Sequence, residues 1–235
     1  MLPLRSAIAR RRGSSLRSCF ALLACALLGL LASPAGAKPR KHEGSAADPS
    51  RWFATRQGLL RVYQARGAKG DASDDGSAPP AGASCEVIES VPKDGDTPAR
   101  TRESCTMISG RKPKGAAQLT YELRTDGIYK VETRVEPPPG QAAPPPSDAE
   151  VLMLPAPATP GTSWSEERGS VKLMRSVKSA GKACKAADRK FGDCLVLSVV
   201  EREGGKVRRK YTETYAAGVG LVEDAQWELI DVKGL

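Results

Sequence analysis

The sequence predicts an all-β protein, a single domain of antiparallel meander strands in one strongly curved sheet (a half-barrel, or an open barrel or sandwich). Short runs rich in Val, Leu, Ile and Tyr alternate with Gly, Pro and Asp turn signals at regular spacing, which is typical of antiparallel sheets. No run requires a helix longer than a turn or two, because the 3.6-residue period of apolar residues is missing. The clearest part is residues 191–230, which predict three consecutive strands joined by two turns.

The earlier strands are predicted from alternating apolar and polar residues. In chain order they are 58–64, 85–91, 102–109, 118–124, 128–135, 151–154, 163–168 and 170–179. Thr125-Asp126-Gly127 is a strong turn signal between two of them. Two stretches, 67–84 and 137–147, are rich in small residues or Pro and lack apolar periodicity, so we expect a flexible loop and an extended loop there.

The last strands carry the candidate ligand face. Gly204-Gly205 supplies two residues that can adopt φ > 0, as a two-residue hairpin turn requires. The returning strand, 206–216, places Tyr211 and Tyr215 on one face, and Trp227 follows on the last strand. These three aromatic side chains could form an apolar face that binds a ligand in the concave sheet. The alternative is that they are simply core, as aromatic stripes usually are.

The charged residues of the same hairpin predict a self-neutralised outer face. If Glu203 pairs with Lys206 across the turn, Glu201 lies opposite Arg208, and opposite charges across strands attract. The run KVRRK is then a solvated face rather than a nucleic-acid site. Glu213 departs from the pattern because it falls on the Tyr face. We expect its carboxylate to reach solvent at the frayed strand end.

The first 37 residues form an export signal. A basic segment precedes an apolar run from Cys19 to Ala32, and Ala35-Gly36-Ala37 has the spacing of a signal-peptidase site. The mature chain then begins at Lys38, with residues 38–50 as a disordered tether and residues 51–235 as the β domain. The formal charge is +9, and the leader contributes five Arg and no acid, so the remainder carries 9 − 5 = +4. That charge alone implies no polyanionic partner.

Two destinations follow from the leader. Cleavage after Ala37 releases the protein to the periplasm or the cell exterior. The alternative is that Leu22-Leu23-Ala24-Cys25 is a lipobox, which would make the protein an outer-membrane lipoprotein anchored at Cys25. Against this, the apolar run continues well past Cys25. A membrane is an expected partner only if Cys25 is lipidated.

The mature chain keeps four cysteines: Cys85, Cys105, Cys184 and Cys194. An even number in an exported chain predicts disulfides, and four cysteines allow three connectivities. We expect the local pairing, Cys85 with Cys105 and Cys184 with Cys194, because each pair brackets a turn-rich segment. A four-cysteine zinc site would need CxxC-like spacing, which the sequence lacks.

Three motifs together resemble elements of a loose group of secreted or lipid-anchored bacterial β-domain proteins whose function is not established. Residues 152–155 (LMLP) with 160–164 (PGTSW) resemble its "LPLP…GtsW" element. Residues 191–195 (FGDCL) resemble "GtFxdCl", and residues 215–222 (YAAGVGLV) resemble "YyApGVGlVk". Ala217 stands where the group has Pro. The resemblance implies a strongly curved antiparallel sheet, and it brings no catalytic residues with it.

Most catalytic chemistry is excluded by composition. The single histidine, His42, lies in the predicted tether, where it cannot serve a Ser-His-Asp or Cys-His site. No glycine-rich phosphate loop is present, so we expect no cofactor, no metal and no catalytic residue. Carboxylate chemistry remains, with Glu166-Glu167 beside Trp164 as candidates for a sugar-cleaving pair. Adjacent residues on a strand point to opposite faces, however, so these two could not act on one bond.

The sequence therefore favours a non-catalytic, exported cell-envelope protein that binds a lipid, an apolar ligand or a protein partner, and not nucleic acid. The alternative is a carboxylate-dependent hydrolase of cell-wall or polysaccharide substrates. A third hypothesis is a surface interaction protein that uses the Pro-rich segment 137–146 (PPPGQAAPPP) for recognition.

Overall fold

The computed structural model describes residues 48–66, 81–109, 112–138, 140–186 and 189–235. The compact unit to which they belong begins at His42. The leader, Cys25, His42 and most of the predicted loop 67–84 lie outside the described residues. No helix among the described residues is long and apolar enough to cross a membrane.

The described chain is all-β, as predicted. One short 3-10 turn, η1 (Pro49–Trp52), precedes twelve strands. The strands are β1 (Leu60–Ala65), β2 (Gly82–Val91), β3 (Ala99–Ser109), β4 (Lys112–Arg124), β5 (Gly127–Glu136), β6 (Val151–Pro155), β7 (Ser163–Arg168), β8 (Val171–Ala186), β9 (Arg189–Glu203), β10 (Lys206–Ala216), β11 (Gly220–Glu223) and β12 (Trp227–Lys233).

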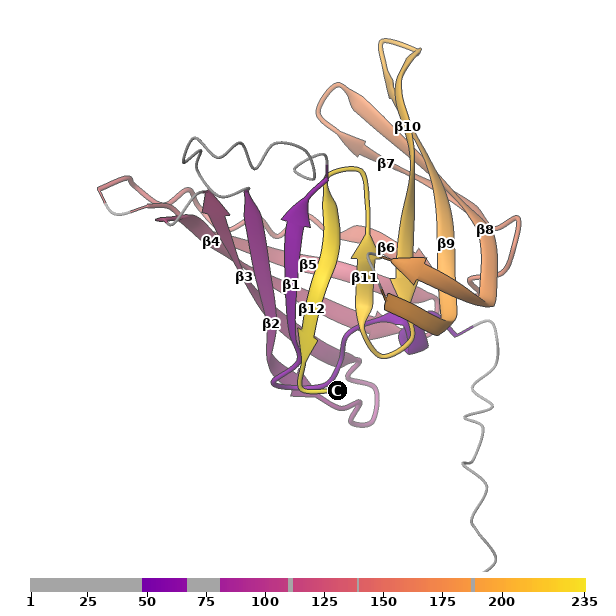
Figure 1. Cartoon of the computed structure of the whole chain (residues 1–235), viewed down its shortest axis with the longest axis horizontal. Coiled ribbons are helices and arrows are strands. Elements are labelled where there is room, and N and C mark those ends of the chain that lie inside the picture. The colour runs from indigo at the N-terminus through magenta and orange to yellow at the C-terminus, as the bar shows by residue number, and fades with distance from the viewer. Residues whose placement is uncertain (1–47, 67–80, 110–111, 139, 187–188) are drawn as a thin grey trace, which may run out of the picture. The chain divides into compact units, whose positions relative to one another are not determined.

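All twelve strands belong to one antiparallel, nearly closed, barrel-like sheet. The spatial order is β6-β5-β4-β3-β2-β1-β12-β11-β10-β9-β8-β7. The first and last strands therefore pair in the middle of the sheet, where Tyr63 lies opposite Leu229. The two edge strands, β6 and β7, are neighbours in the chain. Figure 1 shows the first half of the chain (indigo to pink) on one side and the second half (orange to yellow) on the other.

The segment before β1 packs against the sheet at one end. Trp52 and Phe53 are buried in the largest hydrophobic cluster, where the Phe53 ring meets the Tyr121 ring edge-on, with 4.7 Å between centroids. The Trp52 indole N–H donates to the Asp193 carboxylate over 2.8 Å, and Arg51 forms an ion pair with the same carboxylate. Regular structure thus starts at Pro49 rather than at residue 51, because Asp193 in β9 anchors this turn.

The register of the C-terminal strands corrects two predictions. Glu203 pairs with Lys206 across Gly204-Gly205, as expected, but a bulge follows and places Arg209, not Arg208, opposite Glu201. The guanidinium of Arg208 instead forms an ion pair with Glu203 at 3.2 Å. In addition, residues 191–230 contribute to four strands, because a turn at residues 224–226 separates β11 from β12. The charged hairpin tip therefore does not pair with the last strand.

Two further expectations can be compared with the structure. Cys85 is bonded to Cys105 and Cys184 to Cys194, the local pairing chosen from the sequence. Residues 82–84, expected as loop, are instead the start of β2, where Gly82 lies opposite Gln64 of β1. Residues 140–147 have no regular strand, in agreement with the extended loop, although Ser147 forms a bridge to Thr133.

Candidate functional site

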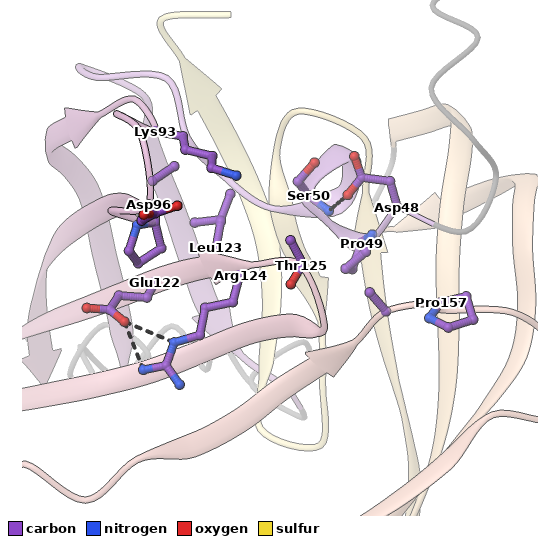
Figure 2. A pocket seen from close by; sticks show the side chains of 13 residues that line it. Asp48, Pro49, Ser50, Lys93, Asp96, Glu122, Leu123, Arg124, Thr125 and Pro157 are labelled. Carbon is purple, nitrogen blue, oxygen red and sulfur yellow. Dashed lines mark hydrogen bonds and ion pairs between the residues drawn. The ribbon is translucent and has the colours of Figure 1, made fainter.

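A cleft of about 900 Å³ opens at the end of the sheet where η1 joins it. It is built by turns that are far apart in the sequence: residues 48–50, the β2–β3 turn, the β4–β5 turn and residues 156–157 after β6. The lining side chains are Asp48, Pro49, Ser50, Lys93, Asp96, Pro98, Ala99, Glu122, Leu123, Arg124, Thr125, Ala156 and Pro157. Figure 2 shows the labelled side chains on turns and strand ends from separate parts of the chain. Volumes in this range are usual for small-molecule sites.

The floor and walls of the cleft are largely apolar. Some of its charged side chains are already held in ion pairs within the protein, and others are free to contact a ligand. Glu122 is bound: it accepts from Arg100 over 2.6 Å and from Arg124 over 2.8 Å, and Arg124 also contacts Glu150. The hydrogen bond from Arg100, opposed by burial and helped by Arg124, lowers the pKa of Glu122 below its usual 4.5. This carboxylate is therefore ionised at neutral pH and cannot donate a proton.

The available charges stand on the β2–β3 turn. Asp94 and Thr97 exchange two backbone hydrogen bonds, and Gly95 between them adopts φ 54°, so the turn is tight. This geometry presents Lys93 and Asp96 on the cleft side (Figure 2), where both side chains are exposed. Among the described residues, neither is joined to an ion-pair partner. An ammonium and a carboxylate can thus contact polar groups of a ligand at the cleft mouth.

A first buried ionic cluster lies deeper in the sheet, around Arg175 of β8. Its guanidinium contacts Glu213 of β10 at 3.2 Å and Glu166 of β7 at 2.9 Å. The Tyr215 hydroxyl donates to the same Glu213 carboxylate over 3.3 Å. Glu213 is only 7% exposed, so the expectation that it reaches solvent is wrong. The guanidinium of Arg175, on a different strand, neutralises the buried Glu213 carboxylate.

A second buried cluster joins β1 to β3. Arg61 and Glu103, each 4% exposed, form an ion pair at 2.5 Å. Burial would lower the pKa of Arg61, but the Glu103 carboxylate and the nearby tyrosines hold it above its usual value. Burial raises the pKa of the neighbouring Tyr63 to about 12. Gly220 lets the guanidinium approach, because a Cβ there would lie 2.9 Å from its Nη1.

The three candidate ligand-face residues do not lie together. Tyr215 is buried in the cluster that contains Trp52, while Trp227 packs in a different cluster around Leu229. Tyr211 is half-buried, with the Arg209 guanidinium 5.4 Å from its ring centroid. None of the three lines the end cleft. A ligand role for these residues stays a prediction.

The candidate carboxylate pair is separated as the strand geometry requires. Glu166 is paired with Arg168 and Arg175 on the buried side, whereas the Glu167 side chain is 76% exposed near Lys172. Burial opposes ionisation of Glu166, but hydrogen bonds from Arg168 and Arg175 outweigh it, so its pKa lies below 4.5. No group of three or more metal-ligating side chains occurs within the described part of the chain.

Sequence reasoning missed the cleft because turns carry no periodic signal. Lys93 and Asp96 lie in a stretch that predicts only a turn, and nothing local indicates that residues 48–50, 122–125 and 156–157 meet it. A partner for Glu213 could have been sought among arginines at buried strand positions. Arg175, flanked by Leu173 and Val177 in the alternation, carries that signal.

No family model matches the chain, and no curated protein matches its sequence. Two solved structures are similar to it. One is a protein of Bacteroides fragilis, provisionally described as exported and with a YmcC-like fold, at TM-score 0.44 and 10% identity, covering 77% of this chain and 98% of that one. The other is a provisionally described lipoprotein of Parabacteroides distasonis, at TM-score 0.41 and 12% identity, with the same coverage. At these values the similarity supports no functional inference, and the motif resemblance stays a prediction.

Proposed function

We propose that this chain is a non-catalytic, exported cell-envelope protein that binds a lipid or another largely apolar ligand in its end cleft. The observation that carries the proposal is the cleft itself: about 900 Å³ with walls from Pro49, Pro98, Leu123 and Pro157. The ligand body would lie against these side chains, and its polar end would meet Lys93 and Asp96 at the mouth. Export is supported by the leader sequence and by the two disulfides, which persist in oxidising compartments.

The acids near the cleft and in the sheet support binding rather than hydrolysis. A general acid needs a carboxyl group that is protonated near neutral pH. Glu122 and Glu166 have lowered pKa values because each accepts hydrogen bonds from two arginines. The buried Glu213 shares Arg175 with Glu166, so both carboxylates are held in ion pairs. These observations favour the binding proposal over the hydrolase alternative.

A cleft-filling substitution tests the proposal. Thr125 is exposed and lines the cleft, so Thr125→Trp should occupy the ligand volume without altering charge. Ser170→Trp, in the exposed β7–β8 turn and outside the cleft lining, is the matched control. The probe is an environment-sensitive fluorescent fatty acid, titrated into the chain from Lys38 onward and competed with unlabelled lysophospholipid.

Saturable, competable binding by the parent and by Ser170→Trp is expected. Thr125→Trp should bind at least about tenfold more weakly, a loss of roughly 1.4 kcal/mol or more. Equal binding by both tryptophan variants would place the lipid elsewhere and refute the role of the cleft. Absence of saturable binding by the parent would refute the apolar-ligand proposal as a whole.

A further inference from the structure

Three charged side chains line the end cleft without an ion-pair partner among the described residues: Lys93, Asp96 and Asp48. One oxygen of Asp48 accepts from the Ser50 amide over 2.9 Å, and its other oxygen faces no printed donor. Figure 2 shows Lys93 and Asp96 on one side of the cleft and Asp48 on the other. The available lining groups are therefore one cation and two acids, a net charge of 1 − 2 = −1. Asp94, on the same turn as Lys93, is a further exposed acid.

This balance of charge separates three kinds of headgroup. The other charged lining residues, Glu122 and Arg124, are held in ion pairs with each other and with Arg100 and Glu150. A purely anionic ligand would thus meet one attractive and two repulsive groups. A neutral headgroup would displace water from these groups without replacing its hydrogen bonds, which is unfavourable. The cleft therefore favours a headgroup that carries both an anion and a cation.

The β2–β3 turn holds the cation and one of the acids in place. Asp94 and Thr97 exchange backbone hydrogen bonds of 3.2 and 2.9 Å, which fix the turn that carries Lys93 and Asp96. Both side chains are on the cleft side (Figure 2), and no ion pair joins them to each other. Because the turn is tight before any ligand binds, a ligand with matching charges loses little free energy in ordering it.

The lining also indicates which cation the headgroup carries. Quaternary ammonium groups such as choline are recognised by the faces of aromatic rings. None of the described residues that line the cleft is aromatic. A primary ammonium instead has three N–H donors, and the Asp96 carboxylate can accept from them. A phosphate would face Lys93, whose ammonium is a compact charge that suits phosphate.

We propose that the ligand of the end cleft is a lipid with a phosphoethanolamine headgroup, its phosphate on Lys93 and its primary ammonium on Asp96. This inference rests on the proposed function, in which the acyl chain lies against the apolar walls, and it adds the class of headgroup. It gives the two residues different tasks. Lys93 contacts the phosphate that phospholipids share, whereas Asp96 contacts the group that distinguishes them.

Competition between lysolipids with the same acyl chain tests this assignment. The competitors are lysophosphatidylethanolamine, lysophosphatidylcholine, lysophosphatidylglycerol and the uncharged monoacylglycerol, each against the fluorescent fatty acid. The test variants are Lys93→Gln and Asp96→Asn. The controls are Lys172→Gln and Glu167→Gln, which make the same charge changes on the exposed β7–β8 hairpin, outside the cleft lining. Thermal unfolding of each variant is measured first, and inhibition constants are corrected for that variant's affinity for the probe.

An exposed charge pair contributes up to about fivefold to affinity. The parent should therefore bind the ethanolamine lipid at least about threefold more tightly than each of the other three. Asp96→Asn should remove the advantage of the ethanolamine lipid over the glycerol phospholipid. Lys93→Gln should weaken all three phosphate-containing lipids by about three- to fivefold and leave the monoacylglycerol unchanged. Both controls should keep the parent's order of affinities.

Other results would overturn the inference. Equal binding of all four lipids by the parent would refute the headgroup assignment alone, whereas no competition by any of them would refute the proposed function as well. Binding of the choline lipid as tight as that of the ethanolamine lipid would refute the role of a primary ammonium. Equal changes in the control variants would mean that only the net charge of the chain matters. Competition by soluble glycerophosphoethanolamine at the same concentration would assign the cleft to a free phosphoethanolamine ester instead of a lipid.

Discussion

Removing one member of the Arg61–Glu103 pair should destabilise the domain far more than removing both. Arg61→Met leaves the Glu103 carboxylate about 5% exposed with no counterion. Breaking a buried pair in this way costs about 3–5 kcal/mol, because an uncompensated charge remains in a low-dielectric interior. For a domain of this size each kcal/mol lowers Tm by about 2–4 °C, so Tm should fall by roughly 6–20 °C. Arg61→Met/Glu103→Leu should return Tm to the parent value or above it.

The assay is thermal unfolding with the disulfides intact, followed by circular dichroism. The matched control is an exposed ion pair between β3 and its neighbour β2, Arg102 with Glu89, at 3.1 Å and more than 40% exposed on each side. Arg102→Met should change stability by less than about 1 kcal/mol, since water screens exposed pairs. If Arg61→Met were no more destabilising than Arg102→Met, the burial argument would be wrong. The burial argument would also be wrong if the stability change of the double variant equalled the sum of the changes in the two single variants. Residues in contact are coupled, so their effects should not add.

Two further predictions concern the disulfides and acid. Replacing either disulfide pair by Ala (Cys85 with Cys105, or Cys184 with Cys194) should lower the free energy of unfolding by about 3 kcal/mol, because the bridges close loops with separations of 20 and 10 residues. Urea unfolding measures this loss. An unfolding midpoint that the substitutions leave unchanged would contradict the prediction. The Glu166 pKa is lowered in the fold, so its ionised form contributes stability that is present above the usual 4.5 and lost as pH falls through the lower folded value. The Tm deficit of Glu166→Gln should therefore be full at neutral pH and shrink in acid, and a deficit that grew in acid would reverse the sign of the argument.

The strand positions could be predicted from the sequence because each strand is determined by residues close to it in the chain. Period-2 alternation and turn residues act between neighbours in the chain, and Thr125-Asp126-Gly127 ends one strand and starts the next as expected. The cross-strand register was less accessible. A bulge after Val207 shifted every following pair by one residue, and no side chain in KVRRK marks that position.

The cleft and the buried ion pairs were inaccessible for a different reason: they depend on which strands become neighbours. β1 and β12 pair only because the sheet nearly closes on itself, which no local pattern encodes. Glu213 was expected to reach solvent because strand ends fray. Arg175 lies 38 residues away and reaches it only in the folded sheet. A buried polar group needs a hydrogen-bond or ion-pair partner. For Glu213, looking for a cation on another strand predicts the structure better than assuming a frayed strand end.

The two buried pairs share a geometry that bears on how the sheet is curved. Arg61 and Glu103 belong to β1 and β3, and Arg175 and Glu213 to β8 and β10, so each pair spans an intervening strand. In a flat sheet, second-neighbour strands are about 9.6 Å apart, twice the usual spacing. Bending the sheet toward its buried face brings such side chains together, and a charge left unpaired there is strongly unfavourable. No ladder joins β6 to β7 among the described strands, so hydrogen bonding does not close the circle. We infer that one ion pair in each half of the sheet helps to set the curvature, which in turn brings the turns around the cleft together.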